Sequence, residues 1–235
     1  MQREIAYGRH RIAFTVAPRA RRTLEIAVEP DGRVTVAAPR DAVPEAIDDK
    51  VRQRAAWILR QQRYFDQFRP RTPERLYIAS ETHLYLGRQY RLKVVPHIQA
   101  SVKLIRGFIV VQTHYPKRAE VTRELAETWF RERAHIKFRE RLELCLERFP
   151  DPETFRPTGI TIRQLAQRWG SMSPAGRLLL NHRLIHAPVD AIDYVITHEL
   201  CHRTEPHHGR RFFEQLERVM PDWERRKARL ERVLA

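Results

Sequence analysis

The chain has 235 residues, of which 42% are hydrophobic, which is enough material for one large domain or two small ones. It contains 44 lysine and arginine residues against 29 acids, and the formal net charge of +15 favours polyanionic partners such as nucleic acid, or simply an arginine-rich solvated surface. The sequence contains no run of about 18 apolar residues, which a membrane-spanning helix would need. We therefore expect no membrane partner.

Two further features of the composition concern the compartment. The opening MQREIAYGRHRIAF lacks the apolar stretch of a secretory signal. Cys145 and Cys201 are too few for a disulfide framework, so we expect a protein of the reducing cytoplasm.

The first forty residues alternate between apolar and polar side chains, which predicts short strands. IAFTVAP is one strand, and Leu24–Val28 and Val34–Ala38 form a hairpin around the turn sequence PDG. Apolar residues at helical spacing then predict one helix over 43–65, with Pro44 in its first turn and Asp41 as its N-cap.

A second β region follows, from residue 83 to residue 114, with turns at Gly87 and Gly107. A long helix is predicted within 115–149. The stretch 158–188 is typical of two strands joined by a glycine-containing loop.

The last predicted elements are helical. PVDAIDYVITHELCH is an apolar helix for which Asp190 is the expected N-cap, with Asp193 close to the capping-box position. The chain is therefore of the α+β class. It consists of a β-rich N-terminal region with one helix, residues 1–115, and a region of residues 116–235 that carries the chemistry.

The chemistry lies in THELCHRTEPHHGRRFF. His198 and His202 are four residues apart, so on a helix both imidazoles lie on one face and can share a metal ion. Glu199 lies to the side of that face, where a carboxylate can take a proton from a water that the metal activates. The alternative is a structural histidine pair that is hydrogen-bonded to Glu199. Burying these polar groups in an apolar helix has a desolvation free-energy cost, which a bound metal would offset.

A catalytic zinc needs a third protein ligand. Pro206 ends the helix before Glu205, and the chain turns back through two adjacent histidines. His208 shares the inward face of the next helix with Phe212 and Leu216, whereas His207 lies on the polar side. Helical spacing thus favours His208 as the third ligand of one zinc ion per chain.

The run RWGSMSPAGRLLLNHRLIHAPVDAIDYVITHELCH, followed by HHGRRFF and MPDW, resembles the YgjP-like metallopeptidases, and RRTLEIAVEPDGRVTVAAP and LYLGRQYRLKV extend the resemblance. These proteins are relatives of the SprT-like proteases, which act on proteins near DNA. The resemblance implies a zincin-like core in the C-terminal region and the pattern HExxH, five residues, His, which again selects His208. The sequence departs from the family pattern at His182 and Gly209.

The family pattern also singles out residues that precede the motif helix. Leu178–Ile185 is the candidate strand for pairing with an extended substrate. The side chains that we expect in the cleft or beside the metal ligands are Trp169, Ser171, Asn181, His182 and Arg183.

Three functions fit these residues. The first is a zinc-dependent peptidase that acts on peptide or protein substrates, with Glu199 as its general base. The second is a metal-dependent hydrolase of nucleoside triphosphates, although no Walker-type glycine loop is present. The third is a nucleic-acid-binding protein with a structural zinc, which needs a fourth ligand such as Cys201.

Overall fold

The computed structural model describes residues 2–29, 31–66, 75–165 and 168–234. The chain divides into two compact units, unit 1 (Met1–Thr72, with Ala235) and unit 2 (Pro73–Leu234). Strands and helices occur in both, which confirms the mixed α+β class and the strand-rich N-terminal region. Within the described ranges, no helix is long and apolar enough to cross a membrane. The sequence division at residue 115 stays a prediction.

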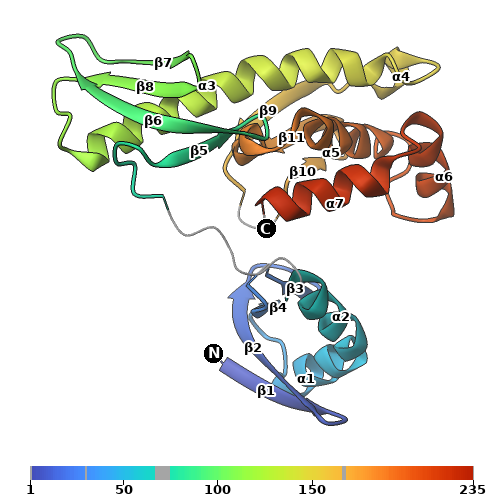
Figure 1. Ribbon diagram of the computed structural model, residues 1–235. Coiled ribbons are helices and arrows are strands. Elements are labelled where there is room, and N and C mark those ends of the chain that lie inside the picture. Colours follow the sequence, from blue (N-terminus) through green and yellow to red (C-terminus); the bar gives the residue numbers. More distant parts are fainter. Residues whose placement is uncertain (1, 30, 67–74, 166–167, 235) are drawn as a thin grey trace. The chain divides into compact units, whose positions relative to one another are not determined.

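Unit 1 is a four-stranded sheet covered by two helices (Figure 1). The strands β1 (Gln2–Tyr7), β2 (His10–Arg19), β3 (Glu25–Val28) and β4 (Val34–Pro39) lie in the order β1-β2-β4-β3. The predicted hairpin is confirmed, because β3 and β4 pair antiparallel, whereas β2 and β4 are parallel. Alternate residues of β2 and β4 are buried, and they form the core with four helical residues, Ile47, Val51, Ala55 and Ile58.

The helix predicted over 43–65 is in fact two helices, α1 (Pro44–Gln53) and α2 (Ala55–Asp66), and Arg54 separates them. Pro44 opens α1 as predicted, but the N-cap residue is Val43 and not Asp41. No side chain caps this helix. The proline favours its start instead, because its fixed backbone angle suits the first helical turn.

Unit 2 begins with a second sheet that repeats the topology of the first. The strands β5 (Thr82–Tyr85), β6 (Arg88–Pro96), β7 (Ser101–Ile105) and β8 (Phe108–Thr113) have the order β5-β6-β8-β7. As in unit 1, the inner two strands are parallel and each outer strand is antiparallel to its neighbour. A helix again follows the fourth strand, here the long α3 (Ala119–Leu146).

A third, small sheet precedes the motif helix. After the short α4 (Pro152–Phe155), strands β9 (Gly159–Arg163), β10 (Gly170–Met172) and β11 (Arg177–Asn181) form a sheet with the order β10-β11-β9. The predicted strand Leu178–Ile185 is wrong in its second half, because the chain leaves the sheet at Asn181 and forms a 3-10 helix, η1 (His182–His186). The Asn181 side chain accepts the Arg183 N–H and so favours this turn.

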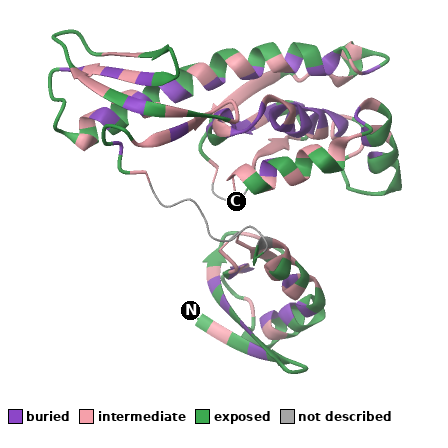
Figure 2. Cartoon of the chain, in the orientation of Figure 1, coloured by how far each residue is buried: buried purple, intermediate pink, exposed green. Residues whose placement is uncertain are grey.

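Three helices complete unit 2: α5 (Val189–Cys201), α6 (Arg210–Val219) and α7 (Trp223–Leu234). Figure 2 shows α5 as the most deeply buried of the three, and it packs against α3, α6, α7 and β10. Its N-cap is Pro188, so the prediction of an Asp190 cap is wrong. Both acids instead make tertiary ion pairs: Asp190 with Arg229, and the buried Asp193 with Arg141 and Arg148.

Candidate metal centre

The HExxH helix brings two imidazoles together, and the turn that follows brings a third. His198 and His202 lie one turn apart on α5, with ring centroids 5.1 Å apart. The chain reverses between Cys201 and Arg210, and the Nε2 atom of His208 comes to 2.9 Å from that of His198 and 3.1 Å from that of His202. One nitrogen from each residue lies within 4.8 Å of the others, which makes this a group able to hold a metal ion.

The chemistry of the three donors fits a metal. Burial, together with the neighbouring His208 and His202, lowers the pKa of His198 to about 3, and burial also lowers the pKa of His208. Both imidazoles are therefore neutral near pH 7 and keep a lone pair for coordination. The Nδ1 atom of His202 lies 2.9 Å from the carbonyl oxygen of Glu205, a contact that makes Nδ1 the donor and leaves Nε2 free as a ligand.

An aromatic ring holds the three histidines in place. Phe212 is fully buried, and its ring centroid lies 4.9 Å from that of His198, 4.6 Å from that of His202 and 4.7 Å from that of His208. The inward position predicted for Phe212 is confirmed, whereas its neighbour Phe213 is 38% exposed. The structure brings His208 into the cluster and leaves His207 exposed, while the ligand roles themselves stay a prediction.

Glu199 is buried beside this cluster, under strand β10. A Cβ atom at Gly170 would lie 2.8 Å from Glu199 Cγ, so the strand backbone passes directly over the side chain. Burial raises the pKa of Glu199 to about 7, against the opposing effects of the Met172 N–H, which donates to the carboxylate, and the charge of Arg168. A carboxylate with a pKa near 7 is suited to general acid–base chemistry.

Aromatic residues of α5, α6 and α7 adjoin the histidine cluster. Tyr194 lies one turn before His198, and its ring stacks on that of Trp223, with centroids 6.3 Å apart. Trp223 in turn contacts Phe213, which lies beside His208. These side chains line the surface next to the histidine cluster.

A cation accompanies the aromatic residues on α7. Lys227 lies one turn after Trp223, is largely exposed, and is 4.0 Å from Glu231. Its positive charge is close enough to contribute to the lowered pKa of both His198 and His208, after the larger effect of burial. Glu199, which β10 covers, and Lys227 of α7 thus both lie near the histidine cluster.

The other candidate residues lie in various surroundings. Asn181 is buried and donates to the carbonyl oxygens of Leu165 and Arg168, so it holds the loop before β10. His182 is buried, and its nearest acid is Glu127 of α3, at 3.9 Å. The remaining three are Trp169, which packs against the core, Ser171, which is half-buried in β10, and Arg183, which is exposed.

A fourth protein ligand is not apparent among the described residues. Cys201 is fully buried outside the histidine cluster, and burial raises the pKa of its thiol to about 12. Because the Cys201 thiol is not part of the group of donor atoms, the site matches the three-ligand arrangement of a catalytic metal better than the closed four-ligand arrangement of a structural one.

The fold and the cluster define a helix-borne HExxH site with a third histidine downstream. Residues 22–233 match the model of the YgjP-like, metallopeptidase domain family, and the chain belongs to this family. No curated protein and no solved structure matches the chain. The sequence did not predict the contributions of Met172, Trp223 and Lys227. The MPDW stretch of the family pattern, which contains Trp223, was the one signal for any of them.

Proposed function

We propose that the protein is a zinc-dependent peptidase in which His198, His202 and His208 hold the metal. The observation that carries the proposal is the approach of His208 Nε2 to 2.9 Å from His198 Nε2 and 3.1 Å from His202 Nε2, in a chain that belongs to a metallopeptidase family. Zinc is the usual metal for three imidazoles, and when bound it acidifies water and polarises a carbonyl group.

Each residue around the metal has a distinct part in this proposal. Glu199 takes the proton of the attacking water, because its pKa of about 7 lets it accept and release a proton at neutral pH. The Met172 N–H fixes the orientation of its carboxylate. Lys227 supplies a positive charge near the cluster, which would stabilise the negative charge that develops on the carbonyl oxygen.

The strand that pairs with the substrate is β10 in this proposal. The sequence analysis favoured the segment that becomes β11, but β11 lies between β10 and β9 and is paired on both sides. The described part of β10 is at the edge of the sheet and adjoins Glu199. An extended peptide added to this edge would lie next to the general base.

Peptides or proteins are the proposed substrates, and the net charge of +15 supports substrates that are associated with nucleic acid. The cytoplasm is the proposed compartment. Cys145 and Cys201 are both buried and unpaired, which is in keeping with a reducing environment.

The first experiment measures the zinc content of the purified full chain by elemental analysis, without added metal. We expect about one zinc per chain in the wild type, and the same in Glu199→Gln. His208→Ala should lose most of it, and His207→Ala, which changes the adjacent exposed residue, should keep it. Loss of zinc in His207→Ala rather than His208→Ala would overturn the assignment of the third ligand.

The reaction is tested on the same preparations with unfolded casein as the peptide substrate. Cleavage by the wild type that is lost in Glu199→Gln, with zinc retained, supports a peptidase. Release of pyrophosphate from nucleoside triphosphates without casein cleavage would instead support the triphosphate hydrolase. Zinc binding with neither activity, together with salt-dependent binding of DNA, would favour the structural role.

A further inference from the structure

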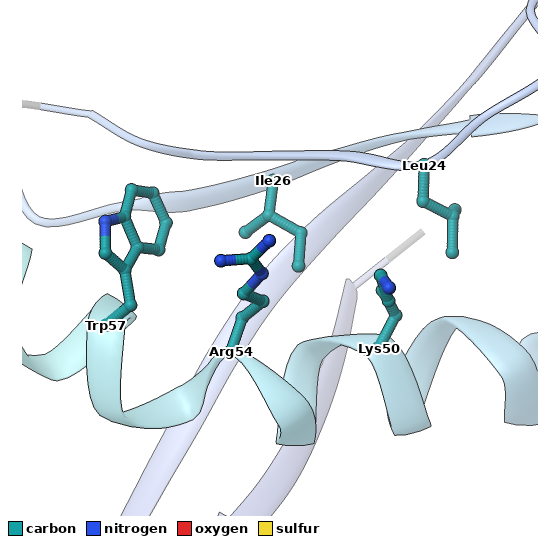
Figure 3. A pocket seen from close by; sticks show the side chains of 5 residues that line it. All are labelled: Leu24, Ile26, Lys50, Arg54 and Trp57. Carbon is teal, nitrogen blue, oxygen red and sulfur yellow. The ribbon is translucent and has the colours of Figure 1, made fainter. Parts of the chain in front are cut away.

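Unit 1 carries a pocket of its own, which the metal centre does not use. It has a volume of about 220 Å³ and lies between the edge strand β3 and the two helices (Figure 3). Its lining combines apolar side chains with two cations: Leu24, Ile26, Lys50, Arg54 and Trp57.

The helical part of the lining forms a single stripe. Lys50, Arg54 and Trp57 follow one another at intervals of four and three residues, so they share one side of α1 and α2. Figure 3 shows the three side chains rising from the helices toward Ile26 and Leu24. The two cations are about 6 Å apart along the helix axis, and the indole ring of Trp57 continues the same row.

The cations of this stripe are not neutralised by the protein. Among the described residues, neither Lys50 nor Arg54 forms an ion pair, and both are exposed. Three acids of α1 and β3 are engaged by other arginines, in the pairs Arg3–Asp48, Arg52–Asp49 and Arg21–Glu25. The pocket therefore offers two positive charges beside a half-buried aromatic ring to a ligand that brings negative charge.

We propose that this pocket binds single-stranded nucleic acid, with a base against Trp57 and backbone phosphates against Lys50 and Arg54. Single strands are bound where a cationic groove follows the backbone and aromatic side chains stack on the bases. A nucleotide brings a flat ring and a charge together in each repeating unit, and the stripe likewise places an aromatic ring next to two cations within two helical turns. An acidic peptide would satisfy the cations but would leave the flat face of the indole without a matching ring.

The test measures the binding of a short fluorescein-labelled oligothymidylate to the full-length protein by fluorescence anisotropy. EDTA is present, so that the result does not depend on the metal centre. Trp57→Leu keeps an apolar side chain and removes the stacking surface, and we expect about tenfold weaker binding. Lys50→Gln with Arg54→Gln removes two phosphate contacts, which should reduce the slope of log affinity against log salt by about 1.4.

The matched control is Arg9→Gln with Arg63→Gln, which removes the same charge from exposed positions of unit 1 outside the pocket. Circular dichroism shows whether each variant keeps its fold. If the control weakens binding as much as the pocket variant, net charge alone attracts the strand and the proposal fails. It fails equally if poly-glutamate displaces the oligonucleotide and Trp57→Leu binds normally, since the ligand would then be an acidic peptide.

Discussion

Glu199 and Gly170 lie so close together that position 170 has no room for a side chain, because a Cβ atom there would come 2.8 Å from Glu199 Cγ. Gly170→Ala must therefore displace either β10 or the carboxylate. We expect the peptidase activity to fall about 100-fold, as a misplacement of about 1 Å in a reacting group can cause. The zinc content should stay at the wild-type level, because no ligand is touched.

The control for this variant is Gly209→Ala. Gly209 follows the third histidine directly, yet a Cβ atom there would meet nothing within 4 Å. It should keep both zinc and activity. Measured side by side, equal losses in the two variants would mean that the contact between Gly170 and Glu199 has no special role in orienting the base.

The local part of the site could be predicted from sequence. The interval between His198 and His202 fixes their common face on any helix, and the spacing from His208 to Phe212 placed His208 on the inward side. The cluster lies within a segment of fewer than twenty residues, but His208 precedes the N-cap Gly209 of α6, so the reversal of the chain and not helical periodicity brings it to the other two histidines.

Tertiary contacts account for what was not predicted. Asp190 and Asp193 have the sequence signature of a helix cap, but arginines of α7 and α3 engage them instead. Met172 and Lys227 reach the site from segments far from the motif, and periodicity does not relate such segments. The repeated sheet topology of the two units was also missed, because their strands share an order and not an evident sequence pattern.

The position of Lys227 predicts an effect on the rate and not on metal binding. Lys227→Met should lower kcat about tenfold in the proposed peptidase, because it removes a positive charge near the histidine cluster that would stabilise the developing oxyanion. KM for casein should change less, and zinc should be retained. Lys227→Arg keeps the charge and should recover most of the rate. A higher KM with an unchanged kcat in Lys227→Met would instead mean that Lys227 only attracts the substrate.

Removal of the buried Asp193 carboxylate should lower the stability of the fold, although Asp193 takes no direct part in the chemistry. Its side chain is 4% exposed and receives two hydrogen bonds of 2.7 Å from Arg141, with Arg148 at 3.2 Å. Asp193→Ala leaves these guanidinium groups without their partner, and we expect the free energy of unfolding to fall by about 3 to 5 kcal/mol.

Urea unfolding measures this loss, and Glu140→Ala serves as its control. Glu140 lies next to Arg141 on α3 but forms an exposed pair with Lys137, so the expected loss is less than about 1 kcal/mol. A similar small loss in both variants would show that the arginines find other partners, and that the network around Asp193 does not hold α3 against α5.

The raised pKa of the buried Glu231 carboxyl determines the direction in which its contribution to stability changes with pH. Burial raises the pKa of its carboxyl from 4.5 to about 7, and Oε2 has no hydrogen-bond partner among the described residues. The folded state therefore binds the proton more tightly than the unfolded state. The stability associated with this group is full below about pH 4.5 and is lost as the pH rises toward about 7.

Glu231→Gln removes this penalty, because glutamine stays neutral at every pH. Above about pH 7 the variant should be more stable than the wild type by about 1 to 2 kcal/mol, a figure reduced for partial solvent screening. Near pH 4.5 the two should differ little. Urea midpoints at both pH values measure the effect, and Glu217→Gln, at an exposed position of α6, should leave the pH dependence unchanged. A constant difference between wild type and Glu231→Gln across the range would mean that the Glu231 carboxyl is ionised throughout, with Lys227, 4.0 Å away, as its counter-charge.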